Sequence, residues 1–379
     1  MAETPAAGPG PGLETGLGVY VHVPFCARRC DYCAFATWTG LDHLASAYVD
    51  ACLSQLRRAY AEGLGPAATV FFGGGTPSRL PAGELSRLLE AIDRTERAEI
   101  TVECNPEDVT VGLLRTYAAA GVNRISLGVQ SLAPHVLAGL GRRHSPEGVP
   151  RAVAAIGEVG FASFSVDLIY GATCETDEDW AATLGGVLDL EPRPPHVSAY
   201  ALHAEPGTPL WRDPGRHPDD DVQARRYEMA DEIFDTAGLG WYEISNWARP
   251  GHECRHNQNY WRQGDYLGVG CAAHSHLGGR RYWNIRTPER YMAAVASGGS
   301  ATAGEERLEP DQRALEALEL SIRTREGVQT VALPDEEELV DLVTREAGRA
   351  VLTVRGRLLA NEVACRLRPP VRTGGTTGG

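Results

Sequence analysis

Three cysteines stand close together near the start of the chain, at Cys26, Cys30 and Cys33 in the segment CARRCDYC. Three thiolates in one short loop can bind three irons of a four-iron cluster and leave the fourth iron open to another ligand. Structural zinc is the alternative, but a closed zinc site needs a fourth ligand, and neither Cys nor His follows at zinc-finger spacing. The spacing therefore favours an iron–sulfur cluster with one open coordination position.

A second candidate site is the glycine run Gly73-Gly74-Gly75-Thr76-Pro77, which follows the apolar residues Val70-Phe71-Phe72. Glycines at the end of a strand allow backbone amides to approach a charged ligand, because no Cβ stands in the way. The same residues could form a simple turn. Their position close to the cysteine loop in the sequence favours a binding role.

The elements that must position these residues are short β-branched runs alternating with amphipathic helices. We expect strands at residues 19–23, 69–72, 100–102, 124–128, 163–170 and 196–202. Repeated βα units predict a parallel sheet with right-handed crossovers, as an incomplete barrel or a doubly wound sheet. In either arrangement the carboxyl ends of the strands meet at one edge, where Glu103, Gln130 and Asp167 would join the cysteine loop and the glycine run.

The rest of the chain predicts further parts. We expect a disordered tail over residues 1–17, a (β/α) core over 18–240, an aromatic and Gly-rich extension over 241–304, a small mostly helical domain over 305–368 and a second tail over 369–379.

Composition excludes several classes of function. The formal net charge of −14 argues against a nucleic-acid partner. The chain contains 36 basic residues, all of them arginine, which excludes a Schiff-base lysine and a phosphate-binding G-K-[ST] loop. Nine cysteines, an odd number, indicate reduced thiols or metal ligation, and neither a leader nor a membrane-spanning segment is evident, so we expect a cytoplasmic protein.

The CxxxCxxC motif with Tyr32 before its last cysteine resembles the radical S-adenosylmethionine (SAM) superfamily. The resemblance implies a partial (β/α)6 barrel of the TIM-like type, a [4Fe-4S] cluster on the three cysteines, and SAM on the open iron. The segments that contain the SAM-contacting positions resemble the coproporphyrinogen-dehydrogenase branch and imply contacts from Tyr20, Tyr32, Gly74, Gly75, Thr76, Glu103, Gln130, Arg142 and Asp167. A helix cap at Asp167 and a solvated surface charge at Arg142 are the alternatives.

The resemblance covers residues 18–367, and this branch contains both a heme chaperone and an oxygen-independent coproporphyrinogen III dehydrogenase. Three features favour the chaperone: Phe35 follows Ala34 where the dehydrogenase has a further cysteine, only a short lead precedes Tyr20, and residues 256–261 read HNQNYW. The dehydrogenase, which decarboxylates propionates by a 5′-deoxyadenosyl radical, stays open as the alternative.

The HNQNYW motif resembles a heme-binding signature and implies heme contacts from His256, Tyr260 and Trp261, with His274 as a further candidate. A buried histidine satisfied by a backbone carbonyl is the alternative for His256. The motif could fold over the mouth of the barrel. The partners implied are heme, heme-acceptor proteins including membrane-associated ones, and an electron donor that the sequence does not identify.

Overall fold

The computed structural model describes residues 16–369, so nearly all of the two predicted tails lies outside the described residues. One curved sheet of 12 strands organises the chain. In spatial order its strands are β14 (Thr302–Arg307), β13 (Arg280–Asn284), β12 (His274–Leu277), β11 (Tyr266–Val269), β1 (Leu17–Val23), β4 (Ala67–Gly74), β5 (Arg94–Cys104), β6 (Arg124–Gln130), β7 (Ser163–Tyr170), β8 (His196–Ala201), β10 (Asn246–Ala248) and β9 (Gly240–Glu243).

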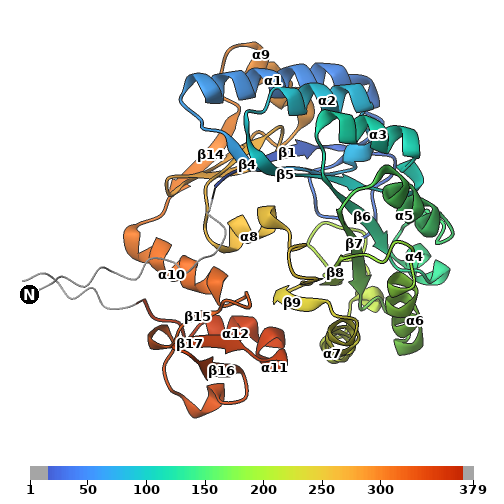
Figure 1. The fold of residues 1–379 in the computed structure, drawn as a ribbon. Coiled ribbons are helices and arrows are strands. Elements are labelled where there is room, and N and C mark those ends of the chain that lie inside the picture. The colour runs from blue at the N-terminus through green and yellow to red at the C-terminus, as the bar shows by residue number, and fades with distance from the viewer. Residues whose placement is uncertain (1–15, 370–379) are drawn as a thin grey trace, which may run out of the picture.

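The six predicted strands correspond to β1 and β4 to β8, and all of their pairings are parallel. Helices connect them along the outer, convex side of the sheet (Figure 1). These helices are α1 (Ala45–Ala61), α2 (Ala82–Glu90), α3 (Val111–Ala120), α4 (Pro134–Gly139), α5 (Gly148–Val159) and α6 (Asp177–Leu188), and α7 (Asp220–Thr236) follows the last of the six strands. The partial (β/α)6 barrel of the radical SAM type is confirmed.

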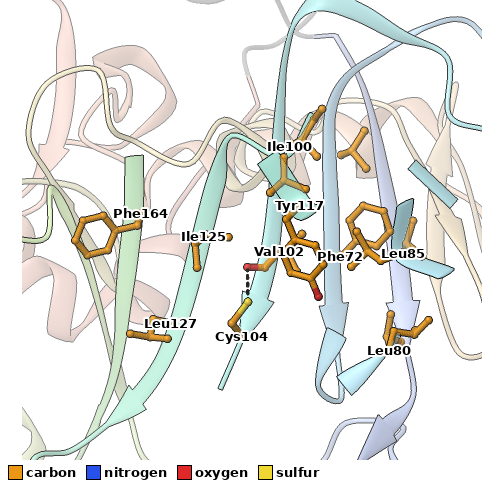
Figure 2. Packing of buried hydrophobic residues seen from close by; sticks show 14 of the residues in the cluster. Phe72, Leu80, Leu85, Ile100, Val102, Cys104, Tyr117, Ile125, Leu127 and Phe164 are labelled. Atoms are coloured by element: carbon orange, nitrogen blue, oxygen red, sulfur yellow. Dashed lines mark hydrogen bonds between the residues drawn. The ribbon is translucent and has the colours of Figure 1, made fainter. Parts of the chain in front are cut away.

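Apolar packing between the helices and the outer face of the sheet holds this barrel together. Tyr48, Val49, Cys52 and Leu56 form one buried face of α1, at the spacing expected for an amphipathic helix. Between α3 and the sheet, Tyr117 packs beside side chains such as Phe72, Val102 and Ile125 (Figure 2). The alternation of the strands then turns every second residue towards the inside of the barrel.

The inner face of the sheet is polar, in contrast to the outer face. Thr69 on β4, Thr101 and Glu103 on β5, Ser126 on β6 and Asp167 on β7 all line the interior. A barrel interior with this many hydrogen-bonding groups suits a polar ligand better than an apolar core.

The extension after residue 240 completes both edges of the sheet. Strand β11 pairs in parallel with β1, and β12, β13 and β14 follow it as antiparallel strands. On the opposite edge, β10 and β9 add antiparallel strands next to β8. Between these strands in the sequence, α8 (Arg255–Trp261) lies inside the curve of the sheet (Figure 1). Helix α9 (Pro288–Ala296) packs on α1.

The C-terminal domain contains α10 (Pro310–Ser321), α11 (Val354–Leu358) and α12 (Ala360–Ala364), in agreement with its predicted helical character. It also contains a three-stranded antiparallel sheet of β15 (Val328–Gln329), β17 (Arg349–Leu352) and β16 (Val343–Glu346), which the sequence did not predict. An ion pair from Arg357 on α11 to Asp231 on α7 fastens this domain to the barrel. The domain boundaries themselves stay predictions.

Among the described residues, no helix is long and apolar enough to span a bilayer.

Candidate functional site

The cysteine loop follows β1 at the carboxyl end of the barrel. Two short strands, β2 (Phe25–Cys26) and β3 (Trp38–Thr39), pair in parallel and close the loop between them. The backbone amide of Asp31 donates to the carbonyl of Leu140 at 3.2 Å, which ties the loop to the segment after α4. Gly141 has φ = +73°, and a Cβ there would lie 2.9 Å from the Asp31 amide nitrogen, so a larger residue would force the loop away.

The three thiols point to the edge of the barrel lumen, where Cys26 is buried and Cys30 and Cys33 are half-buried. The hydroxyl of Thr76 donates to the Sγ of Cys26 at 3.6 Å, and the Nη1 of Arg142 donates to the Sγ of Cys30 at 3.8 Å. Such donors stabilise sulfur that carries negative charge.

Within residues 16–369, no three Cys, His, Asp or Glu side chains converge as the ligands of a single metal ion would. A cubane cluster has no such requirement, because each thiolate binds a different iron. The three thiols and their donors therefore fit a [4Fe-4S] cluster.

The glycine run lies directly against this loop. Gly74 has φ = +113°, and its amide donates to the Oε2 of Glu103 at 3.2 Å. A Cβ on Gly75 would lie 3.0 Å from the Sγ of Cys26 and closer still to two backbone carbonyls. Only glycine permits this close approach of β4 to the cysteine loop.

Glu103 and Asp167 are carboxyl groups inside the barrel, on β5 and β7. Burial raises the pKa of Glu103 to about 8, and the neighbouring Asp167 adds to the shift. Burial also raises the pKa of Asp167, against hydrogen bonds from Ser126 at 2.6 Å and Ser198 at 2.8 Å. Because Ser126 and Ser198 orient this carboxyl group, a helix cap is not the role of Asp167.

Arg142 joins the cysteine loop to the barrel. Its Nη2 donates to the Oδ1 of Asn105 at 3.0 Å and to the carbonyl of Gly128 at 2.9 Å, while its Nη1 faces Cys30. Its Nε also donates to the Nδ1 of His144 at 3.2 Å. Four bonds in different directions fix the guanidinium plane, which a solvated surface charge would not need.

Tyr20, Tyr32 and Gln130 complete the set of predicted SAM contacts. The hydroxyl of Tyr20 bonds the Nδ1 of His22 at 3.2 Å, and its ring stacks on Phe71. Tyr32 lies in the cysteine loop, and Gln130 ends β6 with φ = +65°, which is uncommon for a residue other than glycine. All three line the lumen.

One cavity of about 1240 Å³ connects these groups. It brings together the three cysteines and the nine residues predicted to contact SAM: Tyr20, Tyr32, Gly74, Gly75, Thr76, Glu103, Gln130, Arg142 and Asp167. The cavity runs from the cysteine loop at the carboxyl end of the sheet down to α8.

Helix α8 forms the floor of this cavity, at the amino end of the barrel. The Nδ1 of His256 shares a 2.8 Å hydrogen bond with the hydroxyl of Thr69 near the start of β4, and its Nε2 shares one of 2.8 Å with the hydroxyl of Tyr260. His256 is 1% exposed, and burial lowers its pKa to about 3. The expectation that this motif folds over the mouth of the barrel is wrong, because α8 lies at the opposite end.

The structure does not bring the other two predicted heme contacts into the cavity. Trp261 ends α8 and lines a separate, smaller pocket beside Glu243 and Arg325. His274 lies on β12, is exposed, and stacks on Trp283 with a centroid distance of 5.8 Å. The four predicted heme residues therefore occupy three separate surroundings.

Comparison with known proteins agrees with this architecture. The radical SAM superfamily matches residues 20–185. The heme chaperone HemW of Mycobacterium tuberculosis is 42% identical to this chain, over 95% of this chain and 96% of its own length. The heme chaperone HemW of Escherichia coli K12 is 39% identical over 68% of this chain and 69% of its own. This chain belongs to the HemW family of radical SAM proteins.

A solved structure resembles this HemW-family chain over most of its length. Coproporphyrinogen III oxidase (HemN) from Escherichia coli, described as a radical SAM enzyme, superimposes with a TM-score of 0.80 at 25% identity, over 92% of this chain and 89% of its own. The shared fold extends beyond the barrel into the C-terminal domain.

Sequence reasoning missed three groups in the HemW-family site. Ser126 and Ser198 hold Asp167, and Asn105 bonds both Arg142 and the hydroxyl of Thr76. The two-residue period of the strands was the available signal for Ser126, since it lies four residues before Gln130 on the same face of β6. Neighbours on other strands depend on register, which no local pattern supplies.

Proposed function

We propose that this member of the HemW family is a heme chaperone, which binds heme and transfers it to acceptor proteins. One observation carries the proposal: the Mycobacterium tuberculosis relative named as a heme chaperone is 42% identical over 95% of this chain. Phe35 is 64% exposed and lies in the cysteine loop. The resemblance implies that a dehydrogenase has a further cysteine at this position. This difference also supports the chaperone.

We infer that Cys26, Cys30 and Cys33 hold a [4Fe-4S] cluster whose open iron binds SAM. When bound, the cluster and SAM would together supply reductive cleavage of the SAM sulfonium. The chain's own residues would bind and orient SAM: Arg142 offers a fixed guanidinium for a carboxylate, and Glu103 and Asp167 offer acceptors for hydroxyl and amino groups. The Gly74–Thr76 backbone lies against the cysteine loop that would hold the cluster.

Heme contact by His256, Tyr260, Trp261 and His274 stays a prediction. Heme ligation by His256 would require breaking its bonds to Thr69 and Tyr260, because both ring nitrogens are already engaged. His274 is exposed, and within the described residues its ring nitrogens make no hydrogen bond. Of the two histidines, His274 is the more accessible to a heme iron.

A second candidate is the oxygen-independent coproporphyrinogen III dehydrogenase, which the TM-score of 0.80 to HemN supports. The deciding experiment incubates the anaerobically reconstituted full chain with coproporphyrinogen III, SAM and a reductant, and in parallel titrates it with heme. The chaperone predicts a saturable shift of the Soret band without decarboxylation. Decarboxylation over many turnovers would overturn it.

We further propose a cytoplasmic location, transfer to heme-acceptor proteins that include membrane-associated ones, a separate electron donor, and no nucleic-acid partner. The net charge of −14 supports the last point.

A further inference from the structure

We propose that heme binds at the open mouth of the barrel, above the SAM pocket, with His203 as an axial ligand of the iron and with Arg28 and Arg143 binding the propionates. This inference rests on the proposed heme-chaperone function and names the site at which it acts. It moves the heme away from α8, which forms the floor of the same cavity.

The size of the cavity indicates room for a second ligand. Pockets for one drug-sized molecule measure roughly 300–1,000 Å³. The cavity here is about 1240 Å³, and its lining extends from α8 to the cysteine loop and the segment after β8. Phe35, Tyr200 and His203 also line this cavity but are not among the predicted SAM contacts, so part of the lining remains for another molecule.

Imidazole is a common axial ligand of heme iron, and the histidines that line this cavity differ sharply in their exposure to solvent. His196 and His256 are 1% exposed, and each has at least one ring nitrogen bonded to a tyrosine hydroxyl. The side chain of His203 is 75% exposed, at the carboxyl end of β8. A free imidazole at the rim can reach an iron without unfolding any element.

Glu205 adds a second feature of a metal-binding histidine. Its carboxylate oxygen lies 3.8 Å from the Nε2 of His203. Histidines that bind metals commonly donate their other ring N–H to a carboxylate, which orients the ring and raises its basicity. This separation is longer than a hydrogen bond, and a small rotation of the two exposed side chains would let Glu205 accept from one nitrogen of His203 while the other faces the iron.

The rim also matches the remaining chemistry of heme, an apolar macrocycle with two carboxylates. Phe35 is 64% exposed and Tyr200 is 41% exposed, and both line the cavity. Arg28 and Arg143 are exposed, line the same cavity, and make no ion pair or hydrogen bond with any residue in the range 16–369. Two unpaired guanidinium groups beside exposed aromatic rings suit a porphyrin with two propionates.

The surroundings of His274 lack this combination. The adjacent strand β13 carries Arg280 and Arg281, but Arg280 pairs with Glu305 and Arg281 pairs with Glu306 and Glu316. A propionate binding there would have to displace a carboxylate that is already in place. His274 also lies outside the large cavity, so heme there would have no enclosing walls.

The test uses the full chain with its cluster reconstituted anaerobically, titrated with ferric heme and followed by the Soret band and the low-spin EPR signal. His203→Gly is expected to weaken heme binding about tenfold or more and to change the axial-ligand signature. Added imidazole should restore that signature, which a merely structural role of His203 would not allow. His43→Gly, another exposed histidine outside the cavity lining, is the matched control and should bind as the unaltered chain does.

The propionate contacts are tested with heme dimethyl ester, in which both carboxylates are blocked. Arg28→Gln with Arg143→Gln should weaken the binding of free heme about tenfold and leave the binding of the ester unchanged. Equal losses for heme and ester would contradict the assigned role of the arginines.

The outcomes separate this inference from the proposed function. If the unaltered chain binds heme, and His274→Ala or His256→Ala abolishes the axial-ligand signature while His203→Gly leaves it intact, the site is wrong and the chaperone stands. If the unaltered chain shows no saturable binding of heme, the proposed function fails and the site with it.

Discussion

The imidazole of His256 shares a 2.8 Å hydrogen bond with the hydroxyl of Thr69, and this bond fastens α8 to the amino end of β4. The backbone amide of His256 also donates to Glu99 on β5 at 3.1 Å. A seven-residue helix is too short to be stable alone, so these bonds hold it inside the barrel. The first role of the HNQNYW motif is to close the barrel floor.

His256→Ala should therefore reduce the stability of the fold. The substitution leaves the hydroxyls of Thr69 and Tyr260 without partners in a buried place and opens a cavity, so we expect a loss of about 2–4 kcal/mol in the free energy of unfolding. Urea denaturation followed by circular dichroism measures it. His43→Ala, at an exposed site, should change the same quantity by less than about 0.5 kcal/mol. A loss in His256→Ala as small as this control would contradict the role of α8 as an anchored floor.

The stability contributed by His256 should depend on pH. Burial lowers its pKa from 6.5 to about 3, so the unfolded chain binds a proton that the folded chain excludes in this range. The contribution is complete above pH 6.5 and is lost as the pH falls towards 3, at up to about 1.4 kcal/mol per pH unit.

Comparison of the unaltered chain with His256→Gln isolates this dependence, since other titrating groups such as His22 remain in both. The slope of unfolding free energy against pH between about 4.5 and 6.5 should be smaller in His256→Gln. Equal slopes would mean that His256 does not titrate with unfolding.

The cysteine loop and the glycine run could be predicted because each is a local pattern placed directly after an apolar strand. The convergence of Glu103, Gln130 and Asp167 also followed from parallel strands alone, because their carboxyl ends meet at one edge. The location of α8 could not be predicted in this way. It depends on hydrogen bonds between residues about 160 to 190 positions apart in the sequence, such as those from His256 to Glu99 and Thr69. The sequence contains no signal for that pairing.

The strands β11 to β14 were missed for a related reason. Each has only four to six residues, and β14 reads TAGEER, without apolar residues at alternate positions, so its pattern resembles a loop. They form strands because β1 offers a free edge for β11. Tertiary pairing of this kind overrides weak local propensity.

Cys33→Ala should abolish the iron–sulfur cluster. Each of the three thiols would bind one iron, and no neighbouring side chain can replace Cys33, because the next residues are Ala34 and Phe35. Anaerobically reconstituted unaltered protein is expected to contain about four irons and four sulfides per chain, and the variant close to none. Cys174→Ala, at an exposed cysteine outside the cavity lining, should retain the cluster. Zinc without sulfide in the unaltered protein would contradict the assignment.

Arg142→Lys should weaken SAM binding while leaving the cluster in place. Lysine keeps the charge, but its three donors cannot replace the four bonds of Arg142 to Asn105, Gly128, Cys30 and His144, and the fixed guanidinium plane is lost. We expect a loss of about tenfold in SAM affinity by equilibrium dialysis, with unchanged iron and sulfide content. Arg151→Lys on the exposed side of α5 is the matched control and should bind normally. Loss of iron in Arg142→Lys would instead assign Arg142 to the cluster.

The affinity for SAM should rise with pH through the titration of Glu103. In the free protein, burial and the neighbouring Asp167 raise the pKa of this carboxyl group to about 8, so it is largely protonated at neutral pH. A cationic ligand favours the carboxylate, so binding below pH 8 must release a proton. The contribution of Glu103 to SAM affinity should therefore strengthen by up to about tenfold per pH unit below 8 and level off above it.

Glu103→Gln cannot titrate and removes this component. The dissociation constant for SAM, plotted against pH between about 6 and 9, should therefore have different slopes in the two proteins. Parallel curves would show that the proton released on binding comes from another group.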